Sequence, residues 1–285
     1  MISNATTASF VEKIFEGVLA DRGKLAPWSP KAAQTCDDLR MASPSEDQLV
    51  AVLRRELRDP ALEIAEPPKP VGRGVQAEVW ALRLAATRSE HCVPLVLRVF
   101  RGGDQDEQAR YETAFQNALA EQGFPAPRVI AAGVERDGLG GAFMLMEWLP
   151  GRPLDQLIAP VVGLAVAAAL LDFAWIGAIA LALNLIAATR PALRLHALSG
   201  ERVLESLERS GFSRERALAE GWIPLLEQRV ERLGLDGIRP ALGWLRDNLP
   251  QAGRLVACHG DYHPGNLMVT WRRLSGVIDW ASATD

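Results

Sequence analysis

The chain of 285 residues has few cysteines and no excess of positive charge. Its three cysteines, Cys36, Cys92 and Cys258, lie far apart, and none has the spacing of a metal site or of a C-x-x-C redox motif. A reducing, cytoplasmic compartment is therefore the simplest interpretation, and residues 1–23 lack the basic and apolar blocks of a secretion signal. The formal net charge of −4 gives no general attraction to nucleic acid or to anionic lipid. We expect a small-molecule partner and no nucleic acid.

The composition is that of a globular protein, with 48% apolar and 23% charged residues. Residues 1–45 contain prolines, serines and mixed charges that break any regular period, which predicts a weakly ordered N-terminal extension. Residues 46–150 contain strand patterns before and after one helix, and residues 151–285 are mainly helical. The predicted class is α+β, with a small mixed β lobe and a mainly helical large lobe that meet near residues 149–151.

Local patterns predict the elements of the first lobe. Ser45 is a typical helix N-cap, and the helix after it has an apolar face formed by Leu49, Val50, Leu53 and Leu57. The segment AEPPKP, residues 65–70, predicts a rigid extended connector. Strand patterns cover residues 71–85, 93–101, 127–135 and 140–149, and a helix pattern covers residues 106–122.

Residues 157–188 form a long apolar run whose only charged residue is Asp172. A single membrane span would place Asp172 near the bilayer centre, at a cost of about 2.5–3.5 kcal/mol on insertion scales. Buried helices of a globular lobe are the favoured interpretation. An interfacial insertion with peripheral membrane contact and a true span are the alternatives.

Three oxygen-bearing side chains occur close together near the C-terminus. Asp261 and Asn266 lie in CHGDYHPGN, residues 258–266, and Asp279 lies in SGVIDW, residues 275–280. The sequence between Asn266 and Asp279 predicts a hairpin with a turn at residues 272–273, which would bring these two residues together beside Asp261. Oxygen ligands suit Mg²⁺, and phosphoryl transfer needs such a site.

The segments HGDYHPGNLMV and GVIDW resemble the catalytic loop and metal-binding motif of the aminoglycoside phosphotransferase and choline kinase family, relatives of protein kinases. The resemblance implies a two-lobed protein-kinase-like fold. It also implies that Asp261 is the catalytic residue, which orients the acceptor hydroxyl, and that Asn266 and Asp279 bind Mg²⁺. His259 would hold the loop.

The first lobe extends this resemblance. Gly72 and Gly74 match the loop that covers the phosphates of ATP, with Ala77 at the third glycine position. Arg98 occupies the place of the phosphate-binding lysine, and Glu112 resembles the glutamate that pairs with it. Arginine is bulkier and planar, so this substitution is a departure from the protein-kinase pattern.

The segment FMLMEWLPGRPL, residues 143–154, resembles the strand and hinge that lie against adenine in this family. Met144 or Met146 would contact the ring, and the backbone from Glu147 to Leu149 would bind the edge of the base.

The predicted function is ATP- and Mg²⁺-dependent transfer of the γ-phosphate to a hydroxyl of a small molecule. Aminoglycosides, choline-like alcohols, sugars and macrolides stay open as acceptors. Relatives continue with a helical segment beyond the position of Asp285, so we expect a truncated C-terminus. The alternative is a catalytically impaired pseudoenzyme that binds nucleotide or associates with a membrane.

Overall fold

The computed structural model describes residues 45–73, 77–85, 92–100, 105–134, 139–157, 189–249, 253–270 and 273–283. The expected N-terminal extension, except Ser45, and the apolar run, except Leu157, lie outside these ranges. The chain divides into two units, and each is described by itself. One unit comprises residues 43–211 with 256–285, and the other includes residues 212–255.

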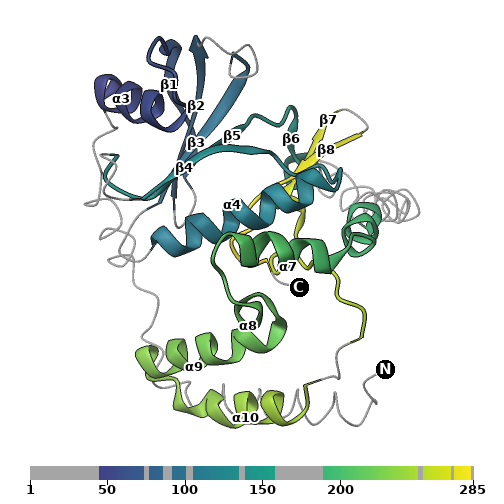
Figure 1. Ribbon diagram of the computed structural model, residues 1–285. Coiled ribbons are helices and arrows are strands. Elements are labelled where there is room, and N and C mark those ends of the chain that lie inside the picture. The colour runs from purple at the N-terminus through teal and green to yellow at the C-terminus, as the bar shows by residue number, and fades with distance from the viewer. Residues whose placement is uncertain are drawn as a thin grey trace, which may run out of the picture. The chain divides into compact units, whose positions relative to one another are not determined.

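The first unit contains a five-stranded sheet in which all neighbouring strands are antiparallel (Figure 1). The strand order is β1-β2-β3-β5-β4. The strands are β1 (Glu63–Arg73), β2 (Ala77–Ala85), β3 (Pro94–Phe100), β4 (Val129–Gly133) and β5 (Phe143–Glu147). Four of the predicted strand segments are thereby confirmed, and the first of them forms the end of β1 together with β2.

The prediction of an extended connector at residues 65–70 is wrong, because these residues lie inside β1, which pairs with β2. The pairing shifts register between Ile64 and Glu66, between Glu66 and Lys69, and between Pro70 and Gly72. Proline cannot donate a ladder hydrogen bond, and it is tolerated at sheet edges and bulges. Since β1 is an edge strand, its prolines fit at these irregular positions.

Helix α3 (Glu46–Glu56) begins as predicted at Ser45, whose side chain accepts a hydrogen bond from the backbone of Gln48. The side chain of Gln48 in turn accepts from the backbone of Ser45, which completes a capping box. Leu49, Val52 and Leu53 are buried, whereas the predicted core residue Val50 is only half-buried. The apolar face is therefore rotated slightly from the one expected.

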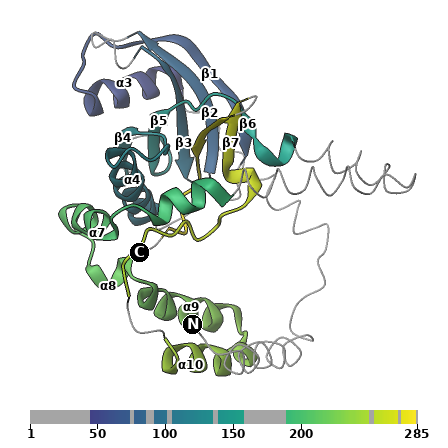
Figure 2. The same ribbon diagram turned by 90° about the vertical axis from the view of Figure 1, so that its right-hand side faces the viewer.

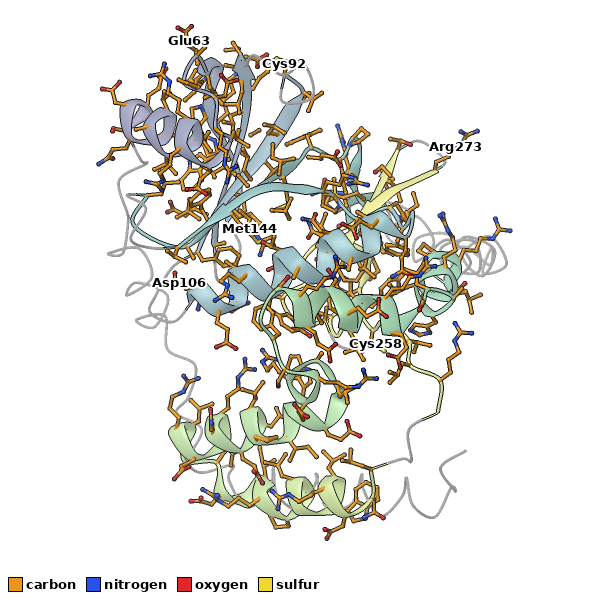
Figure 3. All side chains as sticks on the ribbon, viewed as in Figure 1. Glu63, Cys92, Asp106, Met144, Cys258 and Arg273 are labelled. Carbon is orange, nitrogen blue, oxygen red and sulfur yellow. The ribbon has the colours of Figure 1, made fainter. Side chains whose placement is uncertain are left out.

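Strands β3 and β5 separate the two faces of the sheet by simple alternation. Leu95, Leu97 and Val99 of β3 pack in the cluster that contains the buried face of α3. Val96 and Phe100 pack on the opposite face, with Met144 and Met146 of β5 and Ala109 of the next helix (Figure 3). Arg98 shares this second face, because it alternates with its neighbours along β3.

Helix α4 (Gln105–Glu121), predicted at residues 106–122, lies along the second face (Figures 1 and 2). Its Asn117 side chain donates to the backbone oxygen of Val129 at 3.0 Å and accepts from the Val129 nitrogen at 2.8 Å. This pair of bonds fixes α4 against the edge strand β4. Helix α7 (Gly200–Arg209) packs on α4.

The hairpin predicted near the C-terminus is present. Strand β7 (Leu267–Thr270) pairs with β8 (Arg273–Val277), and the short strand β6 (Arg152–Pro153) pairs with β7 on its other side. Arg273, expected in the turn, is the first residue of β8. The expected turn residue Arg272 lies outside the described ranges.

The second unit is helical. It contains α8 (Arg214–Ala217), α9 (Trp222–Leu233) and α10 (Arg239–Asp247), with short 3-10 turns before α9 and α10. None of the helices in the described ranges is long and apolar enough to cross a membrane. An antiparallel sheet followed by mainly helical sequence confirms the predicted α+β class.

Candidate functional site

A cavity of about 720 Å³ lies in the first unit. It is lined by Val71, Ala77, Val79, Val96, Arg98, Pro127, Met146, Glu147, Trp148, Leu149, Gly151, Arg152, Pro153, Gln156, Asp261, Asn266, Met268, Ile278, Asp279, Ala281 and Ser282. Residues from the sheet, from the segment after β5 and from the C-terminal hairpin therefore share one space. Apolar side chains form much of its walls.

The C-terminal hairpin brings the three predicted oxygen-bearing residues together. The backbone nitrogen of Ile278 donates to the backbone oxygen of Asn266 at 3.0 Å, so Asp279 follows directly from a residue paired with Asn266. The Asn266 side-chain nitrogen donates to the backbone oxygen of Asp261 at 2.9 Å. This bond orients the Asn266 amide, and its other end, Oδ1, is the atom able to bind a cation.

Asp279 has a backbone φ of +65°, in the left-handed region. Such a conformation is uncommon for a residue other than glycine, although Asp and Asn tolerate it better than most. The chain therefore turns at Asp279, two residues after β8 ends, and Asp279 lines the cavity.

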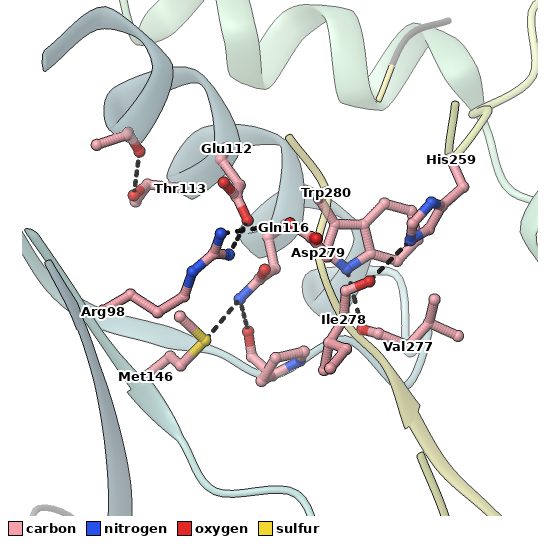
Figure 4. Close-up of polar contacts among 12 residues, drawn as sticks. Arg98, Glu112, Thr113, Gln116, Met146, His259, Val277, Ile278, Asp279 and Trp280 are labelled. Carbon is pink, nitrogen blue, oxygen red and sulfur yellow. Dashed lines mark hydrogen bonds and ion pairs between the residues drawn. The ribbon is translucent and has the colours of Figure 1, made fainter. Parts of the chain in front are cut away.

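His259 holds the loop that carries Asp261. Its Nε2 lies 2.9 Å from the backbone oxygen of Ile278 (Figure 4). Its Nδ1 accepts a hydrogen bond from the backbone nitrogen of Asp261 at 3.3 Å. These two bonds together require a neutral ring with its proton on Nε2. Burial lowers the pKa of His259, and the bond to Ile278 only partly opposes this effect.

Arg98 extends from β3 toward two carboxylates (Figure 4). One guanidinium nitrogen forms an ion pair with Glu112 of α4, which is completely buried. The other nitrogen lies 3.3 Å from the Asp279 carboxylate. The guanidinium also lies 5.1 Å from the centre of the Phe100 ring, a cation–π geometry. Four contacting groups from three parts of the chain thus share one cluster, which is buried at Glu112 and partly exposed at Asp279.

Charge and burial oppose one another in this cluster. Burial alone would lower the pKa of Arg98, but the carboxylates of Glu112 and Asp279 raise it. Burial raises the pKa of Glu112, while the Arg98 guanidinium and the backbone amide of Trp280 oppose that increase. A buried carboxylate needs such partners to stay ionised.

Trp280 connects the segment that carries Asp279 to helix α4, and sequence reasoning missed it. Its side chain is completely buried, and its indole nitrogen donates to the Val277 oxygen at 3.0 Å. Its ring centre lies 4.4 Å from that of His259 and 6.0 Å from that of Phe115 on α4. The only sequence signal was its place directly after Asp279 in GVIDW.

The other end of the cavity is formed by the segment after β5. The backbone nitrogen of Trp148 donates to the Pro94 oxygen at 3.1 Å, so this amide faces the sheet. No acceptor for the backbone N–H of Leu149 is found within the described residues. Met146 lines the cavity, whereas Met144 is fully buried in the core and is not among the lining residues.

The other predicted residues that the structure describes are not among those that line the cavity. Gly72 belongs to β1, where it pairs with Val79 of β2, and Gly74 lies outside the described ranges. Glu112 stands behind Arg98 rather than at the cavity wall. Seven predicted residues thus share the cavity: Arg98, Met146, Glu147, Leu149, Asp261, Asn266 and Asp279.

The donor set fits a hard divalent cation such as Mg²⁺. Asn266 and Asp279 offer one amide oxygen and one carboxylate at the same cavity. Mg²⁺ keeps several waters and commonly binds one or two protein oxygens together with substrate phosphates. Among the side chains that the structure describes, no group of three or more His, Cys, Asp or Glu residues could hold a metal ion. The two oxygen donors suit a cation held jointly with phosphate.

Comparisons with known proteins give distant structural similarities and one family. A protein from Ralstonia eutropha JMP134, provisionally named an aminoglycoside phosphotransferase, is 19% identical, with a TM-score of 0.46 over 84% of this chain and 65% of that one. Macrolide 2'-phosphotransferase from Brachybacterium faecium is 20% identical, with a TM-score of 0.44 over 84% of this chain and 72% of that one. The chain thus spans less than two thirds of the first of these structures.

No curated protein sequence matches the chain. Residues 68–285 match the phosphotransferase enzyme family, over a range that includes Gly72, Arg98, Asp261, Asn266 and Asp279. Because this match covers most of its length, the chain belongs to the phosphotransferase enzyme family.

Proposed function

We propose that the protein binds ATP with Mg²⁺ and transfers the γ-phosphate to a hydroxyl group of a small molecule. The observation that carries this proposal is one cavity lined by Asp261, Asn266, Asp279 and Arg98. These residues supply a base, two cation ligands and a positive charge. Phosphoryl transfer depends mainly on positioning and on charge neutralisation, which such a set can provide.

The nucleotide would lie between the sheet and the C-terminal hairpin. Val79, Val96 and Met146 offer an apolar surface to the base. Its polar edge would meet the backbone N–H of Leu149 and the carbonyl of Glu147, because the Trp148 amide is already bonded to Pro94. In this proposal residues 46–150 form the nucleotide-binding lobe, and Gly72 and Gly74 cover the phosphates.

Asp261 would accept a hydrogen bond from the acceptor hydroxyl and receive its proton as the phosphate is transferred. Its loop is held by His259 and by Asn266, so the backbone that carries this carboxylate is fixed before the substrate binds. Asn266 and Asp279 would hold Mg²⁺, which when bound neutralises charge on the phosphate oxygens. Arg98 would add a positive charge beside them.

Calorimetric titration of ATP, with and without Mg²⁺, tests the nucleotide half of the proposal. We expect the chain to bind ATP more tightly with Mg²⁺, and Asp279→Asn to lose most of that increase. Asp247→Asn is a matched control, since Asp247 is exposed at the end of α10 and lies in the other unit. A folded chain that binds no ATP in the presence of Mg²⁺ would contradict the proposal.

Turnover tests the second half. The chain and its Asp261→Asn variant are incubated with MgATP and a panel of hydroxyl compounds that includes aminoglycosides, macrolides, sugars and choline. Phosphorylated product from the unaltered chain, and a large loss in the variant, would support the role of Asp261. Binding of ATP without product from any acceptor would instead support the pseudoenzyme alternative.

A further inference from the structure

The carboxylate of Asp279 has two uses that conflict. It is an oxygen donor of the proposed cation site, and it forms an ion pair with Arg98 at 3.3 Å. Arg98 in turn is the proposed phosphate contact. A cation at Asp279 and the guanidinium at Asp279 are both positive, so each weakens the attraction of the other for this carboxylate.

Arg98 is held firmly enough for this conflict to matter. Its side chain is 13% exposed, and Glu112 and the Phe100 ring fix it from behind. Asp279 is 46% exposed, so its bond to Arg98 is the weaker of the two ion pairs. The Asp279 bond is therefore the one that can be exchanged for another partner.

The arginine that departs from the protein-kinase pattern contacts its two carboxylates through two different nitrogens. Guanidinium carries its N–H donors on separate nitrogens in a planar fork. One nitrogen of Arg98 contacts Glu112 and the other contacts Asp279. The contact with Asp279 takes up one N–H of its nitrogen and offsets the positive charge there, so a phosphate gains both when that carboxylate moves to another cation.

The net charge of the cavity wall also disfavours a nucleotide without a cation. Its wall carries the basic residues Arg98 and Arg152 and the acidic residues Glu147, Asp261 and Asp279, with Glu112 directly behind. Carboxylates thus outnumber guanidinium groups, and a polyanionic nucleotide meets net negative charge. If the Asp279 carboxylate left Arg98, the positive charge of the guanidinium would no longer be offset there, and Arg98 would have one more N–H donor for a phosphate.

We propose that the Arg98–Asp279 ion pair is a cation-operated gate for nucleotide binding. Asp279 takes up one N–H of Arg98 and offsets its charge, and a divalent cation that takes Asp279 makes this N–H and this charge available to phosphate. The gate makes the chain bind free ATP poorly and the ATP complex of a divalent cation well. This inference rests on the proposed function, because it concerns the same site.

Removal of the Asp279 charge should open the gate without a cation. Asp279→Asn is suited to this test, because Asn tolerates the left-handed backbone at this position. In EDTA we expect the variant to bind ATP about fivefold more tightly than the unaltered chain, the value of a partly exposed ion pair. With Mg²⁺ we expect the order to reverse, because one cation ligand has lost its charge.

Asp261→Asn is the matched control, since it removes an equal charge from the same cavity wall. Asp261 contacts His263 at 3.7 Å rather than Arg98. In EDTA its effect on ATP binding should stay below about twofold, as expected for a solvent-screened charge. Thermal unfolding of both variants, measured in parallel, verifies that each is folded.

Two results would overturn the gate. One is an equal affinity for ATP in EDTA for the unaltered chain and Asp279→Asn, and the other is an equal gain in both variants, which would reflect net charge alone. Failure of the proposed function looks different, because the unaltered chain would then fail to bind ATP even with Mg²⁺. The same titrations thus separate the two ideas.

Discussion

The α-carbon of Gly260 faces the backbone carbonyl of Ser282 so closely that a Cβ atom at Gly260 would overlap its oxygen. Gly260 lies between His259 and Asp261, and Ser282 lies three residues after Asp279. The φ of Gly260, +77°, also lies in the left-handed region. The loop that carries the proposed base therefore rests directly on the segment that follows Asp279.

Gly260→Ala should separate these two segments. The obstacle is a backbone carbonyl, which cannot rotate away as a side chain can, and the left-handed conformation adds strain. We expect the free energy of unfolding to fall by about 3 kcal/mol, from overpacking and backbone strain together. Phosphorylation should fall more steeply than stability, since Asp261 moves with the loop. Chemical denaturation and steady-state kinetics measure the two effects.

Gly123→Ala is the control for backbone strain. Gly123 has nearly the same φ, +78°, but a Cβ atom there would meet nothing within 4 Å. Its cost should be only about 1 kcal/mol, the usual penalty for the left-handed conformation. Equal losses of stability in the two variants would show that the close contact with Ser282 has no energetic effect.

The strands and the helix of the first lobe could be predicted because their apolar residues alternate or recur at regular spacing. Residues 65–70 were different, since the prolines in AEPPKP are typical of an extended segment that lacks ladder hydrogen bonds. Only the position of β1 at the sheet edge, with three shifts of register, makes pairing with β2 feasible. That position depends on the whole sheet, and no local pattern encodes it.

The candidate site was predictable where its residues are adjacent in sequence. Asp261 lies five residues before Asn266, and one hairpin separates Asn266 from Asp279. A hairpin fixes the distance between its two ends. The contact between Arg98 and Asp279 joins residues 181 positions apart and depends on the packing of β3 against the C-terminal segment. The role of Trp280 as a buried link to α4 likewise depends on packing, which spacing alone does not reveal.

Glu112→Gln should destabilise the protein through the Arg98 cluster. Glu112 is completely buried, and its carboxylate faces the guanidinium and the backbone amide of Trp280, both hydrogen donors. A glutamine has no charge to pair with the guanidinium, and its NH₂ group would be buried at one of the two oxygen positions. We expect a loss of about 3 kcal/mol in the free energy of unfolding, typical of breaking a buried ion pair. Urea denaturation measures it.

Glu121→Gln makes the same chemical change at the exposed end of α4. Its effect should stay within about 0.5 kcal/mol, as for most surface substitutions. If Glu112→Gln and Glu121→Gln proved equally mild, Glu112 would have no part in holding Arg98, and the ion pair would add nothing to stability.

Stability should depend on pH through His259. Burial lowers the pKa of this histidine in the folded chain, while in the unfolded chain it titrates near its ordinary value of about 6.5. The contribution of His259 is therefore complete above pH of about 6.5. Below that pH the unfolded chain binds the proton first, so the free energy of unfolding should fall as the pH decreases toward the folded-state pKa.

The difference between the unaltered chain and His259→Gln isolates this effect. Glutamine can offer one donor and one acceptor, as the neutral ring does for Ile278 and Asp261, but it does not titrate. Urea denaturation between about pH 5 and pH 8 should give a stability difference that shrinks as the pH falls. A constant difference across this range would mean that His259 has the same pKa in both states.

Gly276→Ala should act on the nucleotide end of the cavity. A Cβ atom at Gly276 would overlap the Leu149 side chain and would lie 2.7 Å from the Pro125 oxygen, which already accepts a hydrogen bond from Val277 at 2.8 Å. Overpacking of this kind costs about 1–3 kcal/mol of stability. Since Leu149 also supplies the proposed N–H for the base, the dissociation constant of MgATP should rise.

Gly243→Ala is the control, because a Cβ atom there meets nothing within 4 Å. Unchanged MgATP affinity in Gly276→Ala would argue that the base does not contact Leu149.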